Sequence, residues 1–157
     1  GTSVRSVTVV LTTWLNLDAL GDIDVYCDDK RLALSDSFTY RVRMCSGVPN
    51  LLVVCVYFRA SWTLRAGLPA DFVCRLLAHM ESNGAKRVEV TLRPEDNDMK
   101  LLPWMDPENF NPGYLMRAMD LLPKRGEKPE WQPSQDYWRE KDELPLIDLD
   151  GPEFVYG

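Results

Sequence analysis

The chain has 157 residues, 45 % of them hydrophobic and 27 % charged, with a formal net charge of −6. These values are typical of one soluble globular domain, and they exclude a disordered tail, a collagen-like fibre and a disulfide-stapled mini-protein. Because residues 95–157 hold most of the acidic side chains and no basic face is evident elsewhere, binding to nucleic acid is not expected.

The first part of the chain carries the patterns of short strands. Val7–Thr13 is β-branched and almost wholly apolar, which predicts a strand. Residues 23–34 alternate on either side of a pair of aspartates and predict a β-hairpin with one buried face. Phe38–Met44 alternates between apolar and mainly basic side chains, and predicts a further strand whose basic face meets water or a partner.

Two longer apolar patterns follow. Leu51–Phe58 is a continuous apolar run, which suits a central strand covered on both faces and is far too short to cross a membrane. A helical pattern then extends from Ser61, a good N-cap, to the stop signal Asn83-Gly84. Pro69 falls inside this helix, and predicts a kink or a restart. The apolar stripe of the helix consists of Leu68, Phe72, Val73, Leu76, Leu77 and Met80.

After a last predicted strand at Arg87–Leu92, the composition changes. Eight of the eleven prolines lie after residue 102. One short helix is predicted, capped by Asn111, entered through Pro112 and ended by Pro123. Its buried face would consist of Leu115, Met119 and Leu122. Residues 124–157 are predicted as extended chain with a helical turn near 134–141, and such segments usually wrap over another surface.

Together these elements predict a mixed α/β fold with a β-hairpin, a central strand followed by a helix, and a long irregular acidic tail. The central strand needs neighbours on both sides, and few other elements can supply them. We therefore expect part of a larger fold. It divides into an α/β portion, residues 1–93, and a proline-rich acidic extension with one short helix, residues 94–157.

Few side chains carry a chemical signal of their own. The only histidine, His79, lies at the edge of the apolar stripe, so a structural role is favoured. The nine glycines are too widely spaced for a GxGxxG turn, so a self-contained dinucleotide enzyme is not expected. The four cysteines fit no CxxC pattern, which favours reduced thiols, a cytoplasmic protein and no metal site.

Two roles are open for a group of arginines. Arg41 and Arg43, with Arg59 and Arg65, could meet the phosphate of a dinucleotide. They could equally pair with the acidic tail, and we favour that pairing.

Three separated segments resemble one enzyme family. Ser46–Leu51, running on to Tyr57 and then to Ala60–Leu64, is similar to the C-terminal part of flavin-dependent monooxygenases. These are the type I Baeyer–Villiger and flavin-containing monooxygenases, and the resemblance extends to a bacterial branch that also oxidises thioamides. Thr13 with Leu15–Leu17 resembles the segment after the family's linker motif. Later matching positions are Gly113–Ala118, Leu122–Gly126, Trp131, Gln135 and Tyr137.

The resemblance implies a piece of an oxygenase that uses FAD and NADPH to oxygenate ketones or soft heteroatoms. Family members have two dinucleotide-binding domains, and their glycine-rich loops lie upstream of the matched region. By this resemblance, residues 1–93 are the C-terminal portion of a FAD-binding-type domain. The chain would need the upstream domains or a companion chain to be catalytically complete, and no catalytic residue is expected within it.

The resemblance also implies where a cofactor would be met. In the family, the strand matching Leu51–Tyr57 completes the FAD-domain sheet, and the next helix points its N-terminus at the flavin. Backbone N–H groups at a helix start favour the negative charge of reduced flavin. The implied cofactor-binding residues are Asn50, Tyr57, Ala60, Ser61, Trp62, Thr63 and Leu64. The residues themselves equally allow Ser61 as an ordinary helix cap, with Trp62 and Leu64 in the core.

Several positions depart from the family pattern, among them Trp14, Val56 and Arg59. Trp14 and Val56 stand where the family has glycine, and Arg59 replaces an asparagine. Glycine lets the backbone approach a cofactor closely, and these substitutions remove that freedom. They favour an alternative, in which the chain is a truncated or diverged non-catalytic domain that binds a partner or associates with itself as a homo-oligomer.

Overall fold

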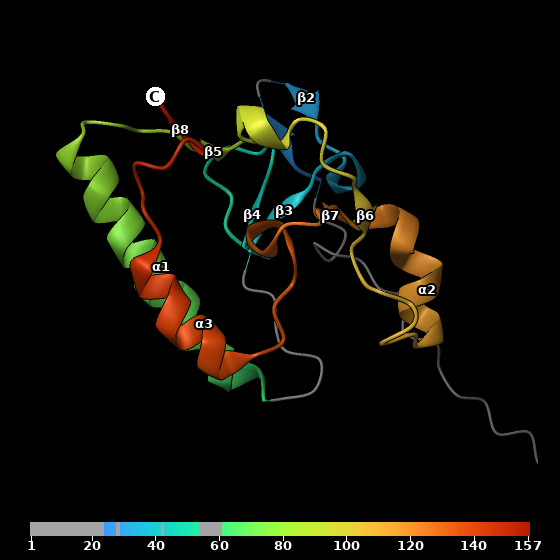
Figure 1. Cartoon of the computed structure of the whole chain (residues 1–157). Coiled ribbons are helices and arrows are strands. Elements are labelled where there is room, and N and C mark those ends of the chain that lie inside the picture. Colours follow the sequence, from blue (N-terminus) through green and yellow to red (C-terminus); the bar gives the residue numbers. More distant parts are fainter. Residues whose placement is uncertain (1–23, 28, 42, 54–60) are drawn as a thin grey trace, which may run out of the picture.

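The computed structural model describes residues 24–27, 29–41, 43–53 and 61–157 of the chain. These residues form a mixed α/β structure, as predicted, and its strands form antiparallel pairs (Figure 1). The helices are α1 (Trp62–Ser82), α2 (Gly113–Ala118) and α3 (Tyr137–Glu143). The strand pairs are β1 (Tyr26–Cys27) with β2 (Lys30–Arg31), β3 (Thr39–Tyr40) with β4 (Met44–Cys45), β5 (Val88–Val90) with β8 (Phe154–Tyr156), and β6 (Leu102–Pro103) with β7 (Lys124–Arg125).

The helices lie on two flanks of these short strand pairs. Helices α1 and α3 are side by side on one flank, and α2 lies on the other (Figure 1). The C-terminal strand β8 lies against β5, near the end of α1 that is opposite to its start (Figure 1). Within the described residues, no helix combines the length and apolar character that a membrane span requires.

The predicted hairpin at residues 23–34 is confirmed as β1–β2. Asp29 occupies the turn with a positive φ of 63°, a conformation that aspartate tolerates better than most residues. The amide of Leu32 donates to the carbonyl of Val25 at 2.9 Å and continues the pairing. The face that carries Tyr26 stays exposed.

The single strand predicted at Phe38–Met44 is wrong. The chain forms β3, turns at Arg41 and Arg43 and returns as β4, with Arg41 at a φ of 47°. The amide of Arg43 donates to the carbonyl of Tyr40 and closes the turn. Of the two alternatives for the basic face, water or a partner, water is excluded for Thr39 and Arg43, which are buried. Alternation alone could not distinguish this hairpin from one continuous strand.

The predicted central strand Leu51–Phe58 lies only partly within the described residues. Leu52 forms an isolated antiparallel bridge with Met44, and the amide of Val53 donates to the carbonyl of Arg43. Residues 54–58 lie outside the described residues, as does the strand predicted at Val7–Thr13.

The long helix α1 has the predicted ends. Ser61 is its N-cap, Asn83 its C-cap, and Gly84 follows with a φ of 67°, the left-handed conformation that glycine adopts without strain. Of the expected kink or restart at Pro69, the restart does not occur, since the helix continues through this buried residue. Phe72, Leu76 and Met80 of the stripe enter the core, whereas Leu77 is 57 % exposed.

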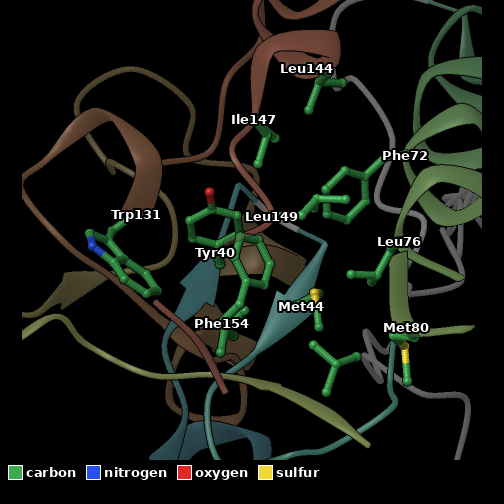
Figure 2. Packing of buried hydrophobic residues seen from close by; sticks show 12 residues of the cluster. Tyr40, Met44, Phe72, Leu76, Met80, Trp131, Leu144, Ile147, Leu149 and Phe154 are labelled. Atoms are coloured by element: carbon green, nitrogen blue, oxygen red, sulfur yellow. The ribbon is translucent and has the colours of Figure 1, made fainter. Parts of the chain in front are cut away.

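The main core is built by both halves of the chain. Helix α1 contributes Phe72, Leu76 and Met80, and the tail contributes a fully buried Trp131 (Figure 2). The ring of Tyr40 packs edge-on against the rings of both Trp131 and Phe154. The other members from the tail are Leu144, Ile147 and Leu149 (Figure 2). The tail therefore belongs to the core, and the helical turn expected near 134–141 is α3.

A second, smaller cluster surrounds α2. Leu115 and Leu122 are buried there with Trp104 and Met105. The predicted short helix is confirmed, but its N-cap is Pro112 instead of Asn111. Pro112 has an extended conformation, and its carbonyl accepts the first hydrogen bonds of the helix.

Candidate functional site

The start of α1 leaves backbone N–H groups without a side-chain cap. The side chain of the N-cap residue, Ser61, accepts no hydrogen bond from these groups, and the first turn contains no acidic residue. The hydroxyl of Ser61 lies 2.9 Å from that of Thr63. The side chains of Thr63 and Leu64 are exposed. An uncapped helix start of this kind favours a negatively charged group, because unpaired N–H groups and the helix dipole act together.

A buried ion cluster fixes this helix start. Arg65, in the first turn of α1, is 1 % exposed and forms an ion pair with Glu140 of α3. Glu140 also pairs with Arg43 of the β3–β4 turn at 3.4 Å, and both of these side chains are buried. One carboxylate therefore joins the helix start, a strand turn and the tail.

A second arginine attaches the middle of α1 to the tail. Arg75 donates through its two Nη atoms to the carbonyls of Leu144 at 2.8 Å and Ile147 at 2.9 Å. Together with the buried ion cluster, these bonds place α3 along α1 (Figure 1). The position of the α1 start therefore depends on the acidic tail.

The predicted cofactor residues do not all lie together. Ser61, Trp62, Thr63 and Leu64 are contiguous at the start of α1. Asn50 instead contacts β5, which lies toward the opposite end of α1 (Figure 1). Tyr57 and Ala60 lie outside the described residues, as do Trp14, Val56 and Arg59. A cofactor role for these residues stays a prediction.

Asn50 has a structural role in this fold. Its side-chain oxygen accepts from the amide of Val88 at 2.9 Å, and its side-chain nitrogen donates to the carbonyl of Lys86 at 3.0 Å. Its backbone amide donates to the carbonyl of Val88. The residue has a φ of 59°, which asparagine tolerates better than most residues. Asn50 thereby covers the edge of β5.

Replacing Asn50 by alanine should lower the free energy of unfolding by about 1–3 kcal/mol, because two side-chain hydrogen bonds are lost at a left-handed position. Urea unfolding followed by tryptophan fluorescence measures the change. Asn50→Gly is the matched control, since it removes the same bonds without the φ penalty and should cost less than alanine. An unchanged unfolding midpoint in Asn50→Ala would show that these bonds carry no stability.

A second buried carboxylate, Asp96, organises the other side of the core. It is fully buried and accepts hydrogen bonds from Arg93 Nε at 2.8 Å and from the indole N–H of Trp131 at 3.2 Å. Lys128 donates to its other oxygen. Burial raises the pKa of Asp96, but the hydrogen bonds from Lys128, Arg93 and Trp131 outweigh burial and lower the pKa to about 2. No sequence pattern indicated this residue, which stands in a polar segment.

The remaining sequence candidates have structural partners. The ring of His79 lies 3.3 Å from a carboxylate oxygen of Asp150, 2.9 Å from the amide of Asn83, and beside the ring of Tyr156. Arg41 pairs with Glu143 of α3, so the favoured pairing of the arginines with the acidic tail is confirmed for Arg41, Arg43 and Arg65. In the described part of the chain, no three potential ligands form a group that could hold a metal ion.

Sequence similarity to known proteins shows that the chain belongs to the family of FAD-containing monooxygenases. It is 39 % identical over 138 residues to FAD-containing monooxygenase EthA of Mycolicibacterium smegmatis, a match that covers 88 % of this chain and 27 % of that protein. It is 38 % identical over 132 residues to EthA of Mycobacterium tuberculosis, covering 84 % and 26 % of the two chains. It is 31 % identical over 144 residues to Probable FAD-binding monooxygenase AlmA of an Acinetobacter species, covering 92 % and 28 %.

The chain spans about a quarter of the length of these relatives. This agrees with its prediction as the C-terminal part of an FAD-containing monooxygenase. No protein-family profile and no solved structure matches the chain.

Proposed function

We propose that the chain is the part of an FAD- and NADPH-dependent monooxygenase that completes the FAD-binding domain, and that the whole enzyme oxygenates ketones or soft heteroatoms in the cytoplasm by Baeyer–Villiger-type chemistry. The observation that carries this proposal is the identity of 39 % with EthA over 138 residues. Because this sequence has no glycine-rich phosphate loop, binding of both dinucleotides requires upstream domains or a companion chain.

Within such an enzyme, the role of this chain is electrostatic. Flavin would supply the oxygen chemistry, and the start of α1, residues 61–64, would face it. The absence of a side-chain cap and of a first-turn acid, among the described residues, fits a negatively charged group at this helix start. The side-chain amide of Asn50 is already bound to Lys86 and Val88. Its proposed role is therefore to hold its own loop against β5. Tyr57 and Ala60 are proposed to contribute from the adjoining segment.

A specific observation favours association with another protein surface as a second function. Leu77 on α1 is 57 % exposed, and Cys74, three residues earlier and therefore on the same face of the helix, is also exposed. This apolar surface would be covered by the rest of the enzyme or by a second copy of the chain. Sedimentation velocity of the purified chain distinguishes the two, since only self-association raises the sedimentation coefficient with concentration.

Replacing Ser61 by aspartate separates a cofactor role from a capping role. Aspartate is a strong N-cap and places negative charge at the helix start, so the chain should become more stable by about 0.5–1 kcal/mol. In a chimera where this chain replaces the matching quarter of EthA, the same charge should weaken FAD binding by repulsion. Thermal unfolding of the chain and FAD retention by the chimera are the two measurements.

The control is Ser82→Asp, which places the same charge at the far end of α1. It should destabilise the helix and leave FAD retention unchanged. If Ser61→Asp stabilises the chain and the chimera keeps its FAD, Ser61 is only a helix cap and the proposed position of the flavin is wrong.

A further inference from the structure

A cleft lies between the β3–β4 turn, α3 and the segment before α3. Its volume is about 430 Å³, within the range of about 300–1,000 Å³ that small-molecule sites occupy. Its polar and charged lining includes Arg41, Ser134, Asp136, Arg139, Glu140 and Glu143. Pro129, Pro133 and Leu144 provide an apolar wall. The residues at the exposed start of α1 do not line this cleft.

The acidic side chains of the cleft are already engaged with donors of the protein. Asp136 caps α3 by accepting from the amides of Trp138 and Arg139. Glu140 is shared by two buried arginines. Glu143 is shared by Arg41 and Arg139, which contact its two oxygens at 3.2 Å and 2.6 Å. Each of these two glutamates therefore faces two guanidinium groups, and the three arginines of the cleft lining balance its three acidic side chains in formal charge.

The two arginines on Glu143 keep donors for another group. Arg41 uses Nη1 and Arg139 uses Nε for this contact, and a guanidinium has further N–H groups. Arg41 Nε is itself buried, with no hydrogen-bond partner among the described residues. The hydroxyl oxygen of Ser134 accepts from the amide of Asp136, so its hydrogen is available to a ligand. Guanidinium groups bind carboxylates and phosphates in a forked geometry.

We propose that this cleft binds a small organic oxyanion, a carboxylate or a phosphate, between the guanidinium groups of Arg41 and Arg139. Glu143 acts as the internal competitor, because it occupies the same two guanidiniums. The apolar wall would cover the carbon part of the ligand. This site is independent of the proposed monooxygenase function, and it stands or fails separately.

The test is a titration of the full chain at low salt with inorganic phosphate and, separately, with benzoate. The Nε–H resonance of Arg139 and the amide resonances of residues 134–136 report binding by NMR. Saturable shifts with either anion support the site, and the anion that binds identifies the ligand as a phosphate or a carboxylate. The absence of saturable shifts with both anions overturns the proposal.

Three variants test whether the arginines bind the anion in competition with Glu143. Arg139→Gln should weaken binding by about tenfold. Arg87→Gln is the matched control, since its side chain is 57 % exposed against 56 % for Arg139, and each arginine pairs with one glutamate. Glu143→Gln should tighten binding severalfold, because the competitor is removed. Equal affinities for Arg139→Gln and Arg87→Gln, or weaker binding by Glu143→Gln, would contradict the proposal.

Discussion

Replacing Glu140 by glutamine should lower the free energy of unfolding by about 3–5 kcal/mol. Glu140 is the carboxylate that Arg43 and Arg65 share, and all three side chains are nearly inaccessible to water. Removal of its charge leaves two buried guanidinium groups facing a neutral amide. The cost is large because a buried charge that loses its counter-charge keeps its desolvation penalty. Chemical denaturation followed by tryptophan fluorescence measures the loss.

Two comparisons make this result specific. Glu143→Gln removes a charge from the same helix, but its side chain is 38 % exposed and should cost at most about 1 kcal/mol. Replacing all three members of the buried cluster by apolar residues of similar volume should recover most of the stability. If Glu140→Gln and Glu143→Gln cost the same, the buried cluster is not what attaches the tail to α1.

The second large effect is expected at Asp96. Asp96→Asn should lower the free energy of unfolding by about 2–4 kcal/mol, because a neutral amide replaces the fully buried carboxylate that accepts from the partly exposed cations Arg93 and Lys128. Asp98→Asn is the matched control two residues away. Its side chain is exposed, and its change should stay within about 0.5 kcal/mol. Equal effects at the two positions would contradict the role assigned to Asp96.

The contribution of Asp96 to the free energy of unfolding should decrease as the pH falls. The pKa of Asp96 is about 2 in the folded protein against an ordinary value of 3.8. A lowered folded-state pKa means that the stabilisation, about 2 kcal/mol, is fully present above pH 4 and is lost as the pH falls toward 2. The wild-type chain should therefore lose more stability than Asp96→Asn between these two pH values. Parallel loss of stability in the two proteins would show that Asp96 does not titrate as described.

Local sequence signals were sufficient for the long helix and for the hairpin. Ser61, Asn83 and Gly84 mark the ends of α1, because capping and left-handed turns depend on residues within one turn of the helix end. The same holds for Asp29 in the β1–β2 turn. These interactions involve neighbours in the chain, so the sequence displays them directly.

Contacts between distant segments could not be predicted in this way. The pairing of β5 with the C-terminal strand β8 joins segments with no shared pattern. Arg43 alternates with apolar residues as a surface residue would, yet it is buried because Glu140 reaches it from the tail. Trp131 stands in a proline-rich segment, and the partner of its buried indole N–H, Asp96, lies in a different segment of the chain.

The same distinction between contacts of chain neighbours and contacts of distant segments applies to the candidate site. The helix start at Ser61 follows from the sequence, because an N-cap residue precedes an apolar helical stripe. The residues that hold this start in place, Arg65 and Glu140, come from two segments far apart in the chain. Sequence spacing could not show that the acidic tail determines the position of the helix that is proposed to face the flavin.

Flavin binding by the EthA chimera tests most directly whether this chain supplies a working part of an FAD-containing monooxygenase. The measurement is the visible absorbance of FAD that co-elutes with the chimera on gel filtration, compared with EthA lacking the matching quarter. We expect one flavin per chimera and little on the truncated protein or on this chain alone. A chimera that is folded by circular dichroism but elutes without flavin would contradict the proposed function and favour a diverged, non-catalytic domain.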